Sequence, residues 1–77
     1  MLDKDQVREY LRWIDQCSER DLNERRKQLT EALGRYAYPD EEWFDLRFML
    51  KHLREEIFAR ECLRVHAEVR RRAGRRA

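Results

Sequence analysis

The chain has 77 residues, of which 44% are charged and 42% apolar, and its 18 basic residues slightly outnumber its 16 acidic ones. With two glycines and one proline, this composition favours one small helical domain and argues against a β-sandwich, a collagen-like repeat or a flexible linker. No apolar run approaches the roughly 18 residues that span a membrane, and the charged start lacks the apolar segment of a signal peptide. We therefore expect a cytoplasmic protein without a membrane partner.

The first segment has the pattern of a capped amphipathic helix. Asp3 is suited to the N-cap position, and Gln6, three residues later, can reach back to its backbone. Apolar side chains then recur at helical spacing, at Val7, Tyr10, Leu11, Ile14 and Cys17. We expect a helix that begins next to Asp3 and buries this stripe.

Ser18 repeats the capping pattern and predicts that a second helix begins beside it. A second apolar stripe follows, at Leu22, Leu29, Ala32, Leu33 and Tyr36. At about 100° per residue, the two stripes share one face, as they would on a single unbroken helix. The sequence leaves both interpretations open, with Gly34 as the expected end of this arm in either case.

A loop around Pro39 precedes a long helix, predicted from about residue 40 to about residue 72, with Glu41 and Glu42 in its first turn. Its first half carries an apolar stripe at heptad-like spacing, at Trp43, Leu46, Leu50, Leu53 and Ile57. Farther on, the stripe moves roughly 100° around the axis, to Phe58, Cys62, Val65 and Val69. Two apolar faces predict two partners, the N-terminal arm and a second copy of the chain.

These patterns predict an all-α fold. An unbroken N-terminal arm gives a helical hairpin, and a break at Ser18 gives a three-helix domain with a long C-terminal helix. In both cases we expect two chains to dimerise into a helical bundle, since a core this small gains little stability by itself. Residues 1–69 form the predicted domain, with 13 basic and 16 acidic side chains, and residues 70–77 form a basic tail.

The sequence contains no set of residues typical of an enzyme or of a cofactor site. Cys62 and His66 are four residues apart on a helix, but a structural zinc site needs four ligands. Opposite charges such as Glu56 and Arg60 are expected on a solvated helix face. Cys17 is expected to be a buried, reduced thiol like Cys62, with a bridge between them as the alternative. We therefore expect no catalysis, metal or cofactor.

The helices carry more aromatic side chains than a single apolar stripe on each helix can bury. Trp13 lies opposite the stripe through Val7, Leu11 and Ile14, which makes it a candidate interface anchor. Phe48 also lies off its own helix's stripe. The predicted partner-binding residues therefore combine these two with the heptad-like stripe, and they are Trp13, Trp43, Leu46, Phe48, Leu50, Leu53 and Ile57.

Five arginines crowd the last eight residues, at Arg70, Arg71, Arg72, Arg75 and Arg76. Such a cluster can neutralise phosphates independently of sequence, which makes it a candidate nucleic-acid-binding site. The alternative is a helix end whose cations suit the negative end of the dipole and increase solubility.

Between positions 10 and 57, a set of single residues matches positions in the sequence pattern of a known protein family. These residues are Tyr10, Leu11, Cys17, Asp21, Glu24, Arg25, Tyr36, Asp40, Glu42, His52 and Glu56. With the order of elements, they resemble the Hha/YmoA family of small nucleoid-protein modulators. The family's Asp-His-Arg run appears here as Lys51, His52 and Leu53, and the C-terminal region does not match. The resemblance implies binding to an oligomeric DNA-binding regulator, without enzymatic activity.

Together these features predict a small, non-enzymatic interaction or regulatory module that acts as a homodimer and binds a protein partner. Two alternatives stay open. One is a nucleic-acid-associated modulator, either Hha/YmoA-like or acting through the arginine cluster. The other is a structural component of a larger assembly.

Overall fold

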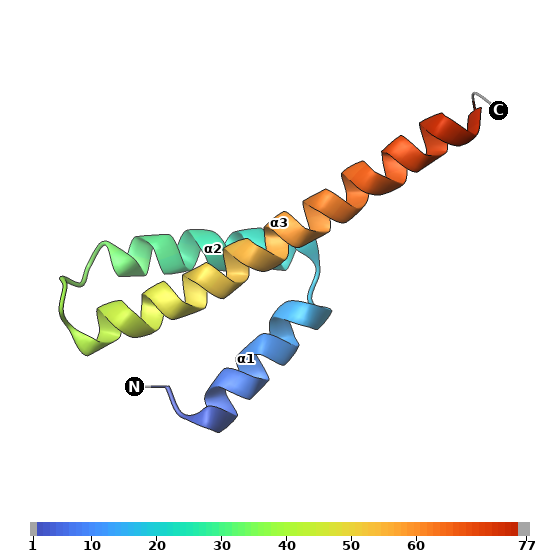
Figure 1. Ribbon diagram of the computed structural model, residues 1–77. Helices are drawn as coiled ribbons and strands as arrows, with labels where there is room; N and C mark the ends of the chain where they lie inside the picture. The colour runs from blue at the N-terminus through green and yellow to red at the C-terminus, as the bar shows by residue number, and fades with distance from the viewer. Residues whose placement is uncertain (1, 76–77) are drawn as a thin grey trace.

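The computed structural model describes residues 2–75, and in this part of the chain it consists of three helices: α1 (Lys4–Gln16), α2 (Glu19–Leu33) and α3 (Glu41–Arg75). Figure 1 shows α2 lying alongside the first half of α3, with α1 below them and the second half of α3 extending alone. The all-α prediction is confirmed for the described residues, in its three-helix form.

The helix caps lie where the sequence predicts them. The Asp3 side chain accepts a hydrogen bond from the Gln6 amide at 2.8 Å, and the Gln6 side chain accepts one from the Asp3 amide at 3.0 Å. The Ser18 hydroxyl likewise accepts a hydrogen bond from the backbone amide of Asp21 at 3.2 Å. The chain breaks between Gln16 and Glu19, so the hypothesis of an unbroken N-terminal arm is wrong.

The second connection spans residues 34–40 between α2 and α3. The Gly34 amide donates to the Thr30 carbonyl at 3.3 Å and closes α2. The Asp40 carbonyl accepts hydrogen bonds from the amides of Trp43 and Phe44, at 3.1 and 3.3 Å, and opens α3. Helix α3 continues to Arg75, three residues beyond the predicted end, so residues 70–75 of the basic segment belong to the helix.

The core is a small cluster to which all three helices contribute. Its buried members are Ile14, Leu22, Leu29, Leu50 and Leu53. Each such side chain contributes about 1.5–3 kcal/mol relative to an exposed one. Seven partly buried side chains surround this cluster, and they are Tyr10, Trp13, Cys17, Leu33, Leu46, Met49 and Ile57. The three-helix body is therefore held mainly by apolar packing between residues 10 and 57.

Tyr10 fixes α1 against α3 with a polar contact at the edge of the core. Its hydroxyl donates a hydrogen bond of 2.7 Å to the backbone carbonyl of Met49. Burial disfavours the charged phenolate and raises the pKa of Tyr10 to about 12. The neutral hydroxyl is thus the form that this packing stabilises.

The molecule is elongated because α3 is more than twice as long as either of its neighbours. The backbone extends 56 × 25 × 19 Å, with a radius of gyration of 16.3 Å. A compact chain of this length has a radius of gyration of about 11 Å. We call residues 58–75 of α3, the part that extends past the core, the overhang (Figure 1).

Candidate interaction surface

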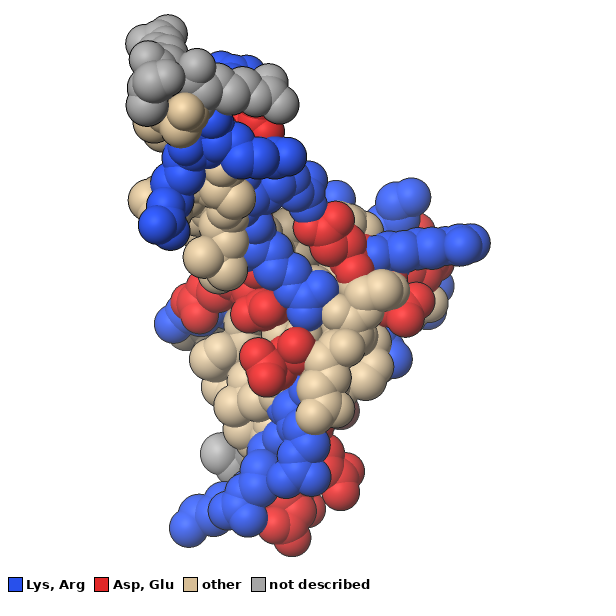
Figure 2. All heavy atoms as spheres, turned by 90° about the vertical axis from the view of Figure 1, so that its right-hand side faces the viewer, with Lys and Arg blue, Asp and Glu red and all other residues tan. Residues whose placement is uncertain are grey.

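The overhang exposes a line of apolar side chains on one face of α3. Phe58 is 70% exposed, Val65 53% and Val69 56%, and Cys62 is also exposed. Their spacing of four, three and four residues places them in one stripe, as in a coiled-coil seam. We call these four residues the seam. In Figure 2, tan side chains lie between the blue basic groups on the projecting end of α3.

Leu63 is a second kind of exposed apolar residue. It is 69% exposed, as much as Phe58, but lies roughly 130° around the axis from the middle of the seam. Single exposed leucines are common on protein surfaces. Leu63 is therefore the natural reference for the seam, equal in exposure and separate in position.

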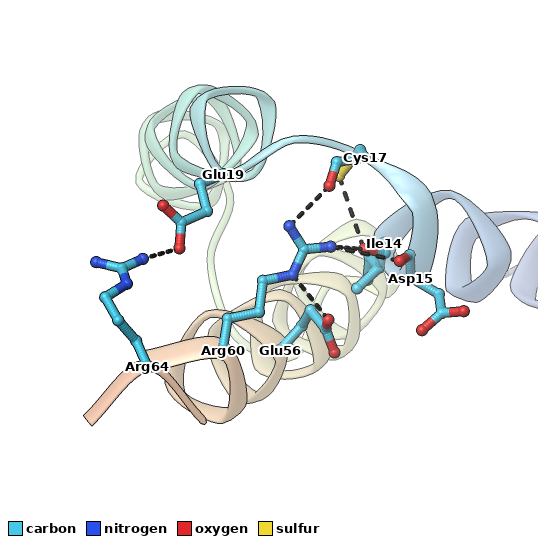
Figure 3. A network of polar contacts seen from close by, with 7 residues as sticks. All are labelled: Ile14, Asp15, Cys17, Glu19, Glu56, Arg60 and Arg64. Carbon is cyan, nitrogen blue, oxygen red and sulfur yellow. Dashed lines mark hydrogen bonds and ion pairs between the residues drawn. The ribbon is translucent and has the colours of Figure 1, made fainter. Parts of the chain in front are cut away.

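Arg60 fixes α3 to the end of α1 at the base of the overhang (Figure 3). Its guanidinium donates hydrogen bonds to the carbonyls of Cys17 at 2.7 Å and Ile14 at 2.9 Å. Its Nε donates to the Glu56 carboxylate at 2.9 Å. The carbonyls at a helix C-terminus lack partners within the helix and carry partial negative charge, which this cation compensates. The prediction that Glu56 and Arg60 pair on a solvated face is wrong, since both side chains are partly buried.

Arg64 makes a second connection, one turn farther along the overhang. Its guanidinium pairs with Glu19 in the first turn of α2 and, at 3.2 Å, with Glu61 on its own helix (Figure 3 shows the Glu19 pair). All three side chains are more than half exposed, so these ion pairs are worth little individually. Together with Arg60, they mark where the overhang leaves the body.

Much of the predicted partner-binding stripe packs in the core of the single chain. Leu50 and Leu53 are 3% and 0% exposed, because α2 covers that face of α3. They are therefore not available to a second molecule, which corrects their assignment as interface residues. Leu46 and Ile57 are partly buried against the same core.

Trp43 and its aromatic neighbours cover the other end of the body. The Trp43 ring lies edge-on to Phe44 and Tyr38, with centroids 5.2 and 5.3 Å away, and the Arg47 guanidinium lies 5.3 Å from it. Phe44 and Tyr38 are 49% and 70% exposed, whereas Trp43 is partly buried. This cluster closes the bundle end at the loop and leaves only part of the Trp43 ring accessible.

Phe48 is also partly buried, and its ring lies 4.4 Å from that of His52 on the same helix. It lines an open groove of about 400 Å³ on the surface of α3, together with Arg47, Leu50, Lys51, Arg54 and Glu55. Phe48 is thus a predicted interface residue that lines an open groove on the body.

Trp13 packs on the core, which corrects its predicted position opposite the buried stripe. The buried face of α1 holds Ile14, with Tyr10 and Trp13 partly buried beside it, and Leu11 is left 39% exposed. The Trp13 ring stacks on Tyr10 with centroids 6.2 Å apart, and the Arg25 guanidinium lies 5.1 Å from it. Trp13 is partly buried by these contacts, so its role is mainly to join α1 to the body.

The arginine cluster lies at the tip of the overhang. Arg70, Arg71 and Arg72 are exposed, and Arg71 and Arg72 pair with Glu68 at 2.7 and 3.4 Å. Arg75 is the last residue of α3, and its side chain lies outside the described part, as does all of Arg76. Glu68 thus partly neutralises the predicted phosphate-binding cluster.

Both cysteines are free thiols, and Cys62 is exposed, which corrects the expectation that it is buried. Burial raises the pKa of the Cys17 thiol, which also lies 3.7 Å from the Ile14 carbonyl. Among residues 2–75, no group of three or more His, Cys, Asp and Glu residues could hold a metal ion.

No profile of a known protein family matches the chain, and neither a curated protein nor a solved structure matches it significantly. The resemblance to the Hha/YmoA family thus has no family match to support it. Within the described residues, no helix combines the length and apolarity needed to cross a membrane.

Proposed function

We propose that this chain is a small, non-enzymatic protein–protein interaction module that acts in the cytoplasm as a homodimer. The observation that carries the proposal is the seam, because Phe58, Val65 and Val69 are each more than half exposed on one face of α3. Covering one such side chain contributes about 1.5–3 kcal/mol. Two overhangs that pair through their seams cover both lines at once, and the dimer presents two three-helix bodies to a regulatory partner.

The residues next to the seam restrict this pairing to the overhang. Toward the body, the same line of α3 continues with Arg47, Lys51 and Arg54, at a spacing of four and three residues. Two copies that extended their pairing along this line would bring like charges together, which is unfavourable. The proposed dimer therefore joins residues 58–69 of each chain and leaves the surfaces of the two bodies uncovered.

Sedimentation equilibrium over a micromolar concentration series tests the dimer. We expect the wild-type mass to rise towards twice the monomer mass, and Val65→Glu, which places a charge in the seam, to remain monomeric. Leu63→Glu is the matched control, with the same new charge at a site that is 69% exposed against 53% for Val65, and should associate like the wild type. A wild-type chain that stays monomeric, or a Leu63→Glu effect equal to that of Val65→Glu, would refute the proposal.

A nucleic-acid role is the second candidate, carried by the three exposed arginines Arg70, Arg71 and Arg72. Fluorescence anisotropy with a short duplex DNA at several salt concentrations tests it. Binding through these residues falls with rising salt and should be lost in Arg70→Glu/Arg71→Glu. Equal binding by this variant and the wild type would exclude the arginine cluster as the contact.

A further inference from the structure

Five basic side chains from two helices meet on the body, on the side where α3 and α2 form open grooves. They are Arg26 and Lys27 of α2 and Arg47, Lys51 and Arg54 of α3, and all are exposed. Arg54 lies at the centre, because it lines one groove with Arg26 and Lys27 and another with Arg47 and Lys51. We call these five residues the basic ridge.

The basic ridge is not neutralised by the chain itself. Within residues 2–75, none of its members forms an ion pair, whereas Arg60 and Arg64 on the same helix both do. One turn to either side of Arg54 lie apolar residues, Leu50 and Phe58, which cannot pair with it. Arg47 and Lys51 are also one turn apart, a like-charge spacing that destabilises a helix.

Three carboxylates border the ridge and leave it positive. Glu31 lines one groove, Glu55 lines another and lies 3.8 Å from His52, and Glu61 lines a third with Arg26 and Arg54 but pairs with Arg64. Five cations against these three anions leave an excess of positive charge, on a body whose residues 1–69 carry more acidic than basic side chains. The ridge is therefore a local positive field, suited to an anionic group of limited extent.

The lining of the groove beside Arg47 indicates what kind of anion fits. The partly buried ring of Phe48 lines this groove beside the basic residues, so an occupant meets apolar as well as charged surface there. A nucleic-acid backbone offers phosphates but no apolar side chains to such a groove, and the acidic body around the ridge would repel a long polyanion. A helix with carboxylates and apolar side chains on one face complements both features.

We propose that the basic ridge binds an acidic, amphipathic helical segment of a protein partner. Its carboxylates pair with Lys51, Arg54 and Arg26, and its apolar side chains cover Phe48. The ridge lies on the body and adjoins the seam at Phe58, which shares a groove with Arg26 and Arg54. Val65 lies two turns farther along α3, so a substitution there tests the seam separately from the ridge.

Fluorescence anisotropy tests the site with a fluorescein-labelled synthetic peptide of about 14 residues, roughly 21 Å as a helix, with Glu and Leu at helical spacing. A second peptide replaces each Leu by Ser, and a short duplex DNA carries the same label. The ridge variant is Lys51→Glu/Arg54→Glu, and the matched control is Arg8→Glu/Arg12→Glu on α1, with the same change in net charge at exposed sites. Circular dichroism confirms that both variants are folded.

We expect the Glu/Leu peptide to bind, with a Kd at least about tenfold higher for the ridge variant and changed by less than about twofold for the control. Val65→Glu, which disrupts the seam alone, should bind this peptide like the wild type. Absence of binding by the wild type, equal losses in the ridge and control variants, or equal binding of the Ser peptide would each overturn the proposal. Tighter binding of DNA than of peptide, lost in the ridge variant, would assign the ridge to nucleic acid instead.

Discussion

Leu53 and Leu63 are ten residues apart on one continuous helix, yet Leu53 is fully buried and Leu63 is 69% exposed. The two leucines have the same intrinsic helix propensity. Their surroundings differ, because α2 packs along the first half of α3, whereas the second half contacts α1 and α2 near its start, through Arg60 and Arg64, and then extends alone (Figure 1).

The two halves of α3 are therefore stabilised differently. The first half gains free energy from buried apolar surface shared with α1 and α2. The overhang relies on backbone hydrogen bonds and on ion pairs such as those of Glu68 with Arg71 and Arg72, worth a few tenths of a kcal/mol each. A helix can thus extend beyond its own domain, but its apolar residues then stay available to other molecules.

The largest expected effect comes from shortening Leu53, which tests whether the body carries the stability. Leu53→Ala leaves a cavity in the core and should lower the free energy of unfolding by about 3–5 kcal/mol. Leu63→Ala, the same chemical change in the overhang, should cost less than about 0.5 kcal/mol. Urea denaturation followed by circular dichroism measures both. Similar costs for the two variants would show that the halves of α3 do not differ as described.

High pH should loosen the body through Tyr10. An unfolded tyrosine releases its proton near pH 10, whereas burial raises the pKa of Tyr10 to about 12. The contribution of the neutral hydroxyl is therefore complete below pH 10 and is lost as the pH rises to about 12, by about 2–3 kcal/mol. Tyr10→Phe should remove this part of the pH dependence in denaturation curves, and Tyr38→Phe, at an exposed loop position, should retain it.

Arg60 and Arg64 lie at the boundary between the two halves of α3, and substituting each should affect stability differently. Arg60→Ala leaves carbonyls at the end of α1 without their donor and should cost about 1–2 kcal/mol. Arg64→Ala removes only exposed ion pairs and should cost less than about 0.5 kcal/mol. Hydrogen exchange should also show faster exchange in the last turn of α1 for Arg60→Ala alone. Unchanged exchange there would mean that Arg60 does not fix α1.

The smallest expected effect on stability is in the seam. Val65→Thr keeps the β-branched shape and, in dilute solution where the chain is monomeric, should change the free energy of unfolding by less than about 0.5 kcal/mol. Thermal denaturation at low and high protein concentration separates the two roles of this residue. A large loss at low concentration would place Val65 in the fold of the single chain.

Local features of the fold could be predicted from sequence, and features that depend on contacts between helices could not. Asp3 and Ser18 specify helix starts through neighbouring backbone amides, so their roles are visible in a few residues. The break before Ser18 competed with a shared apolar phase, and both α1 and α2 do contribute apolar residues to one core. Periodicity alone does not distinguish one long helix from two that share a core.

The candidate interaction surface could be predicted only in part, because it also depends on contacts between helices. The apolar pattern showed that α3 has two faces, but it did not show which face the chain covers itself, so Leu50 and Leu53 were assigned to a partner. Arg60 was missed because its partners are backbone carbonyls more than 40 residues away. The available indication was its position one turn after Ile57, the last residue of the predicted apolar stripe.

The slender outline of the molecule, 56 Å long and 19 Å at its narrowest, has a consequence for hydrodynamic experiments. A rod-like particle experiences more friction than a sphere of equal mass, so it elutes early from a gel-filtration column calibrated with globular standards. A monomer would then elute at the volume expected of a globular dimer. Light scattering at the column outlet, which weighs particles irrespective of shape, removes that ambiguity.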